Sequence, residues 1–139
     1  MKDWIGIIAD IFTIVASGIA IYLFIINKDK ISSAINLMLN YSKQITLADL
    51  KYKIERLNDY TTTNDNQKQE VINILSDIEG QINGNPSIKI ALSDKVKKIS
   101  KFIESPINLT EPKKRSLVSE LRESVRHIDV TNYNEIIKK

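Results

Sequence analysis

The chain contains no cysteine, and among its 139 residues it has only four glycines, three prolines and one tryptophan. Without cysteine it forms no disulfide and offers no thiolate to a metal ion or to a catalytic reaction. Glycine and proline are scarce, and no region alternates apolar and polar residues at period two over a useful length, which favours helices over strands. The composition therefore predicts an all-α protein.

Residues that carry catalysis are also scarce. His127 is the only histidine, and at a predicted helix end we expect it to be solvated or to cap the helix. The segment from Gly80 to Gly84 lacks the Lys-Ser or Lys-Thr pair of a phosphate-binding loop, and no Gly-x-Ser-x-Gly elbow occurs. The carboxylates lie at the spacings of exposed helix faces. We therefore expect no enzyme, no cofactor and no metal site.

The longest apolar run lies at the amino terminus. From Trp4 to Ile26 the sequence reads WIGIIADIFTIVASGIAIYLFII, 23 residues with one formal charge, at Asp10. A helix that rises about 1.5 Å per residue would make this run roughly 35 Å long, enough to cross a bilayer. A signal peptide is the competing interpretation, but the run is longer than an h-region and the start of the chain is not clearly positive. We predict a retained, single-pass transmembrane helix.

The polar and small residues of this run recur at steps of three, four, three, four and three. They therefore form one stripe along the helix, whereas the other faces carry aliphatic and aromatic residues suited to lipid. A carboxylate inside a bilayer costs a few kcal/mol and normally faces protein or water. The members of this polar stripe are Asp3, Gly6, Asp10, Thr13, Ser17 and Ala20.

One helix per chain cannot shelter the Asp10 carboxylate, so we expect parallel copies to turn the polar stripe toward a shared axis. Small-residue stripes occur in dimers through pentamers, and a tetramer is favoured. If the axis holds water, a ring of Asp10 carboxylates selects cations, and apolar residues further along gate by dewetting. The alternative is an anchor that dimerises without a pore, with Asp10 protonated or directed to the near interface.

Three parts are expected along the chain: a transmembrane helix over residues 1–27, a membrane-proximal helical stalk over 28–60, and a cytoplasmic helical ligand-binding or regulatory domain over 61–139. Lys28, Lys30 and Lys43 follow the membrane helix, whereas only Lys2 and the amino terminus precede it. This positive-inside bias places the carboxyl-terminal bulk in the cytoplasm, with the helix in the inner (cell) membrane.

The stalk carries an apolar seam that takes up the polar stripe with little change of phase. Its spacing is narrow enough for a coiled coil or a bundle contact. Thr46 and Asp49 resemble a capping box, so we expect a break near Ile45 or Thr46; without it, residues 28–60 form one long helix. The members of the seam are Ile31, Ile35, Met38, Ser42 and Ile45.

The remainder predicts three further amphipathic helices and hence an α-helical bundle. The first extends from about Asn66 to Ile82, and the second from Pro86, with Asn85 as its cap, to about Ser105. The third begins after Thr110, and a short final segment follows over residues 133–137. The positions expected to face the core are Leu47, Leu50, Ile54, Leu57, Val71, Ile74 or Leu75, Ile78, Ile82, Ile88, Leu92, Val96, Ile99, Phe102, Ile103, Leu117, Leu121, Val125 and Ile128.

Basic residues concentrate in the last part of the chain, where residues 80–139 carry twelve Lys or Arg against seven Asp or Glu. Arg and Lys bind phosphate, and if the last two long helices pair antiparallel, both basic sets would line one groove. An oligomer would repeat this groove as a ring able to hold a nucleotide or a short single strand. Solvated helix faces and attraction to anionic lipid are the alternatives. The candidate ligand-binding residues are Lys97, Lys98, Lys101, Lys113, Lys114, Arg115, Arg122 and Arg126.

An amino-terminal membrane helix with a polar stripe, followed by a helical domain with a basic patch, resembles the Hailong protein A family of bacterial antiphage membrane effectors. The similarity is one of layout over most of the chain. It implies a homo-oligomeric channel whose cytoplasmic crown binds a DNA oligomer that gates the channel, and a partner protein that synthesises this ligand. The alternative function is a membrane-anchored helical adaptor that recruits a protein partner without forming a pore. For the channel, the resemblance implies that the pore is bordered by Asp10, Thr13 and Ser17 and that the ligand is held by Lys97, Lys98, Lys101, Arg122 and Arg126.

Overall fold

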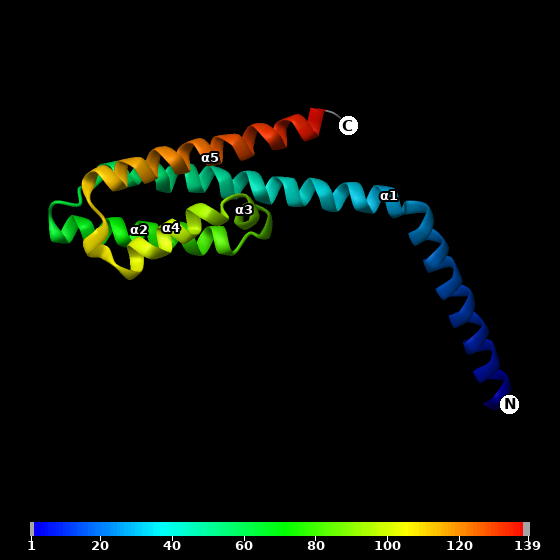
Figure 1. Ribbon diagram of the computed structural model, residues 1–139. Coiled ribbons are helices and arrows are strands. Elements are labelled where there is room, and N and C mark those ends of the chain that lie inside the picture. The colour runs from blue at the N-terminus through cyan, green and yellow to red at the C-terminus, as the bar shows by residue number, and fades with distance from the viewer. Residues whose placement is uncertain (1, 138–139) are drawn as a thin grey trace. The chain divides into compact units, whose positions relative to one another are not determined.

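The computed structural model describes the backbone of residues 2–137 and the side chains of residues 4–131. Helix is the only regular secondary structure in these residues, as Figure 1 shows, and the all-α prediction is confirmed. Contacts divide the chain into two compact units, residues 1–39 and 40–139. The elements, with η for a 3₁₀ turn, are α1 Lys2–Arg56, η1 Leu57–Asp59, α2 Asp65–Asn83, α3 Pro86–Ala91, α4 Ser93–Glu104, η2 Pro106–Asn108 and α5 Glu111–Ile137.

The first unit consists of the amino-terminal part of α1. Its side chains at residues 4–39 are exposed except that of Asn27, which is half-buried and whose Nδ2 donates to the carbonyl oxygen of Leu23 at 2.9 Å. By length and composition α1 can cross a membrane, and its apolar run is not buried in the chain's own core. Signal sequences and core helices of soluble proteins share such a composition.

α1 continues without a break from Lys2 to Arg56, so the expected break near Ile45 or Thr46 is wrong. The Thr46 hydroxyl donates to the carbonyl oxygen of Ser42 at 3.0 Å instead of capping a new helix. No glycine or proline interrupts residues 28–56, and Leu47 and Leu50 bury the same side of the helix just beyond the expected break. The helix then tightens into η1 and ends at Tyr60.

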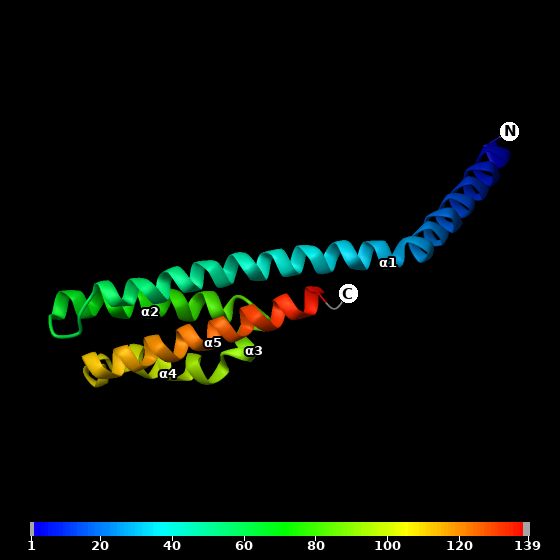
Figure 2. The same cartoon turned by 90° about the horizontal axis from the view of Figure 1, so that it is seen from above.

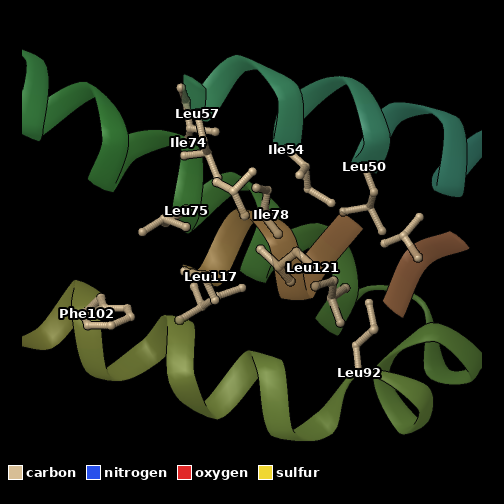
Figure 3. Close-up of a cluster of buried hydrophobic side chains, with 14 of the residues drawn as sticks. Leu50, Ile54, Leu57, Ile74, Leu75, Ile78, Leu92, Phe102, Leu117 and Leu121 are labelled. Carbon is tan, nitrogen blue, oxygen red and sulfur yellow. The ribbon is translucent and has the colours of Figure 1, made fainter. Parts of the chain in front are cut away.

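The second unit packs α2, α3, α4 and α5 with the carboxyl-terminal part of α1 around one apolar core (Figures 1 and 2). Figure 3 shows leucine and isoleucine side chains from α1, α2 and α5 pointing toward one another, with Leu92 and Phe102 beside them. Most of the positions expected to face the core are buried, and Val96, Ile103 and Ile128 are half-buried against it. Helical periodicity therefore predicted the inward faces of these helices correctly.

Local sequence determines several helix starts in this unit. Asn64 caps α2 by accepting from the backbone nitrogens of Asn66 and Gln67, and Asn85 caps α3 by accepting from Ile88. Pro86 occupies the first turn of α3, where its missing N–H removes no helical bond. These assignments confirm the predicted helix over about residues 66–82 and the predicted start at Pro86.

The predicted single helix from Pro86 to Ser105 is instead two helices. α3 ends at Ala91, and α4 begins at Ser93 after a turn at Leu92, whose φ of −111° and ψ of 18° are not helical. Leu92 is 1% exposed, so its side chain is anchored in the core at the turn. Neither glycine nor proline marks this turn in the sequence, because tertiary packing rather than local preference produces it.

α5 begins directly after Thr110, as predicted, but differs from its predicted form at the carboxyl-terminal end. It begins at Glu111, where the Lys114 nitrogen donates to the Thr110 carbonyl oxygen at 2.9 Å, and Pro112 lies in its first turn. It then continues to Ile137, so residues 133–137 belong to this helix and are not a separate segment.

Candidate functional site

The polar stripe of α1 is exposed wherever its side chains are described. Gly6, Asp10, Thr13, Ser17 and Ala20 have no burial by other parts of the chain, and the Asp3 side chain lies outside the described residues. The Thr13 hydroxyl donates to the Ala9 carbonyl at 2.9 Å and the Ser17 hydroxyl to the Thr13 carbonyl at 2.7 Å. Each hydroxyl hydrogen is therefore used within the helix, and the oxygen lone pairs point outward as acceptors.

On this stripe, Asp10 has no hydrogen-bond donor and Gly6 has no neighbouring side chain within the described part of the chain. No donor among the side chains of residues 4–131 pairs with the Asp10 carboxylate. A methyl group added at Gly6 would meet no atom within 4 Å, so the chain's own packing does not require glycine there. A glycine on the surface of a membrane helix allows a neighbouring helix to approach closely.

A second candidate site is an open hollow along α4, with a volume of about 520 Å³. Lys97 and Lys101, one helical turn apart, are exposed on it and make no ion pair among the described residues. Three of the eight predicted ligand-binding residues thus lie together here. The residues that line the hollow are Asp94, Lys97, Lys98, Lys101 and Phe102.

Glu120 on α5 connects this hollow to the next helix. Lys98 Nζ lies 2.6 Å from one of its oxygens and Lys95 Nζ 2.9 Å from the other. Hydrogen bonds from these two lysines lower the pKa of Glu120 to about 2, so the carboxylate is ionised at neutral pH. Lys98 is therefore engaged with Glu120, whereas Lys97 and Lys101 are the lysines of the hollow without an ion pair among the described residues, and Asp94 adds one negative charge to the same lining.

The arginines of α5 bind carboxylates of the chain itself. Arg122 forms a two-point pair with Glu55 of α1, with nitrogen–oxygen distances of 2.7 and 2.9 Å, and these bonds lower the pKa of Glu55. Arg126 lies 2.7 Å from Glu123, one turn away on α5. Arg122 is thus directed toward α1 and not toward the hollow on α4.

The amino-terminal turn of α5 holds an ion pair between the buried Lys114 and the half-buried Glu111, which we call the Lys114 clasp. Lys114 is 2% exposed; its Nζ lies 3.0 Å from Glu111 and donates to the Tyr60 carbonyl oxygen. The Thr62 nitrogen donates to the other Glu111 oxygen at 3.0 Å. Burial raises the pKa of Glu111, but bonds from Thr62, Lys114 and Arg115 outweigh it and lower the pKa to about 2. Lys114 therefore fastens the turn after α1 to α5.

The predicted basic set is consequently spread over several surfaces. Lys97, Lys98 and Lys101 share the hollow, whereas Lys113 donates to the Asn108 carbonyl oxygen at 3.1 Å and Lys114 is buried. Glu120 and Glu123 were expected as partners if these are ordinary solvated helix faces, and both are paired with basic residues. Glu55 was missed because periodicity along one helix does not tell which residue of another helix faces it. The participants not predicted from the sequence are Glu55, Lys95 and Glu111.

No three His, Cys, Asp or Glu side chains of the described residues gather closely enough to hold a metal ion. Comparison of the chain with protein-family models, curated proteins and solved structures finds no significant match. The polar stripe of α1 and the hollow along α4 are therefore the features of the described residues that bear on function.

Proposed function

We propose that the chain is a homo-oligomeric membrane channel controlled by an anionic ligand on its carboxyl-terminal helical unit. The observation that carries the proposal is the exposed Asp10 carboxylate, which stands on an apolar helix with no partner among the described side chains. Such a carboxylate is costly in lipid and is stabilised by water or by other protein. Parallel copies that turn the polar stripe to a common axis would surround the Asp10 carboxylate with water and with neighbouring helices.

The chemistry of the stripe suits cations. A tetramer would bring four Asp10 carboxylates to the axis, and the Thr13 and Ser17 oxygens, whose hydrogens go to the helix backbone, would face it as acceptors. Gly6 would allow the helices to approach closely at one end of the stripe. Apolar residues beyond it would close the path by excluding water when the helices move together.

The carboxyl-terminal unit would be cytoplasmic, since Lys28 and Lys30 follow the apolar run directly. Its ligand site would be the hollow with Lys97, Lys98 and Lys101, repeated around the oligomer axis. A single-stranded DNA oligomer or a nucleotide matches this chemistry, and the layout shared with the Hailong protein A family supports a role in antiphage defence. The ligand moves the gate only if it binds one arrangement of subunits better than the other.

We expect Asp10→Asn to lower the preference of the channel for cations over anions at least several-fold, because the ring loses its charge and keeps its size. The measurement is the reversal potential across a planar bilayer with a KCl gradient. Asp29→Asn, the same chemical change outside the apolar run, is the matched control and should leave selectivity unchanged. Equal selectivity of both variants and the unchanged chain contradicts the proposal, as does an absence of current from the unchanged chain both with and without a single-stranded oligonucleotide.

We expect Lys97→Glu with Lys101→Glu to weaken binding of a short single-stranded oligonucleotide at least tenfold. For each phosphate that the variant no longer binds, the slope of log affinity against log salt should also fall by about 0.7. Fluorescence anisotropy in detergent micelles measures both quantities. Lys68→Glu with Lys89→Glu changes the net charge equally at lysines that lie outside the hollow and outside the predicted ligand-binding set, and should have a much smaller effect. Equally weakened binding in the two variants would show a diffuse charge effect and no site at the hollow.

One observation favours the adaptor as the second candidate function. Five of the eight predicted ligand-binding cations already pair with carboxylates of the chain, namely Lys98, Lys114, Arg115, Arg122 and Arg126. A bundle with paired surface charges suits a protein partner as well as a phosphate ligand. If the chain is an adaptor, it carries no current in the bilayer measurement. Asp10→Asn then leaves the binding of the protein partner by the bundle unchanged.

A further inference from the structure

Two faces of α1 differ sharply where the helix meets the bundle. Tyr41, Ile45 and Tyr52 are 70%, 54% and 63% exposed, and Ala48 between them is also exposed. At 3.6 residues per turn this row lies on roughly the opposite side of the helix from the buried face. The side chains of that buried face, Leu47, Leu50 and Ile54, are at most 1% exposed in the bundle core. The bundle therefore leaves the tyrosine-bearing face of α1 uncovered.

This exposed face belongs to a longer row with the spacing of a coiled coil. From Ile31 to Tyr52 its members recur at steps of three, four, three, four, three and four, which is two residues in every seven. The row runs close to the predicted seam. It contains Ala34 and Tyr41 where the seam has Ile35 and Ser42, which flank the row, and its alternation of three and four residues is therefore unbroken. We call this set the heptad row: Ile31, Ala34, Met38, Tyr41, Ile45, Ala48 and Tyr52.

The same alternation connects the heptad row with the polar stripe. Four, three and four residues lead from Ala20 through Phe24 and Asn27 to Ile31. Because α1 is one uninterrupted helix, the alternation of three and four residues extends from Asp3 to Tyr52. A helix whose contact positions keep a strict seven-residue repeat is suited to a partner helix with the same repeat.

We propose that residues 31–52 of α1 form a parallel, in-register coiled coil with further copies of this chain, the heptad row at its centre and each bundle on the outside. The partner is a second copy because it presents the same repeat. The parallel direction rests on the proposed function, since membrane insertion places the same end of every copy at the membrane. Ile35 and Leu37, 53% and 70% exposed beside the row, widen the apolar surface and suit more than two helices.

Cysteine cross-linking tests this arrangement in the full-length chain, which has no cysteine of its own. A disulfide requires Cα atoms within about 7 Å, so only positions near the oligomer axis should form one between subunits. We expect Ile45→Cys and Tyr52→Cys, oxidised in native membranes, to give at least fivefold more disulfide dimer on non-reducing gels than Asn36→Cys and Leu39→Cys. The two controls are exposed residues of the same helix that point away from the row.

Thr13→Cys, on the polar stripe, separates the failure of this inference from that of the proposed function. Cross-linking at Thr13 but not at Ile45 and Tyr52 overturns the coiled coil and leaves the membrane oligomer in place. Cross-linking at Ile45 and Tyr52 without any bilayer current supports the coiled coil and overturns the channel. Equal dimer yields at the row and at the control positions overturn the coiled coil whatever the current.

Discussion

Lys114→Met is expected to lower the free energy of unfolding of the carboxyl-terminal unit by about 2 kcal/mol, the order of the cost of leaving a buried hydrogen-bond acceptor without its donor. Methionine keeps most of the side-chain volume but removes the cation from the Lys114 clasp. The Tyr60 carbonyl then loses its buried donor, and Glu111 keeps its negative charge with one partner fewer. Urea unfolding of the full-length chain in mild detergent, followed by circular dichroism, measures the change.

Lys113→Met is the matched control for the Lys114 clasp. It makes the same chemical change one residue earlier, at an exposed lysine that donates only to the Asn108 carbonyl oxygen. Exposed substitutions of this kind usually change stability by less than about 0.5 kcal/mol. Equal urea midpoints for the two variants would show that the buried lysine does not fasten the turn after α1 to α5.

Leu50→Ala is expected to lower the free energy of unfolding of the same unit by about 3 kcal/mol, within the range for buried leucines. Leu50 is 0% exposed, and Figure 3 shows it on α1 directed into the core. Truncation removes buried apolar surface and leaves a cavity that the neighbouring helices fill only in part. The urea midpoint of the full-length chain in mild detergent again measures the loss of stability.

The control for Leu50 lies on the same helix. Leu39 is 62% exposed, so Leu39→Ala removes the same atoms without opening a cavity and should change the urea midpoint little. If both variants lose similar stability, the carboxyl-terminal part of α1 does not contribute one face to the bundle as described.

Much of the fold could be predicted from the sequence because helical periodicity is a local property. The apolar spacing of Val71, Leu75, Ile78 and Ile82 predicted both the existence and the buried face of α2, and Asn85-Pro86 predicted the start of α3. Two turns were predicted wrongly. The turn at Leu92 was not predicted because it depends on packing, and the break predicted at Thr46 does not form, since the Thr46 hydroxyl donates to the Ser42 carbonyl oxygen within a continuous helix.

The candidate sites were less predictable, since they depend on which helices face each other. Three consecutive basic residues, Lys113, Lys114 and Arg115, predicted one exposed cationic cluster, yet Lys114 is buried and Arg115 lies 3.2 Å from Glu111. Arg122 and Glu55 are 67 residues apart in the sequence, and no local pattern joins them. The polar stripe differs, because spacing along one helix is enough to place its members on one face.

The Lys114 clasp also fixes the order in which the newly made chain can fold. Thr62 and Glu111 are 49 residues apart, so the turn after α1 stays unfastened until the ribosome has released the start of α5. Domains fold as their segments emerge, and α1 emerges first. The face of α1 that carries Leu47, Leu50 and Ile54 therefore stays uncovered until the other helices of the bundle have emerged.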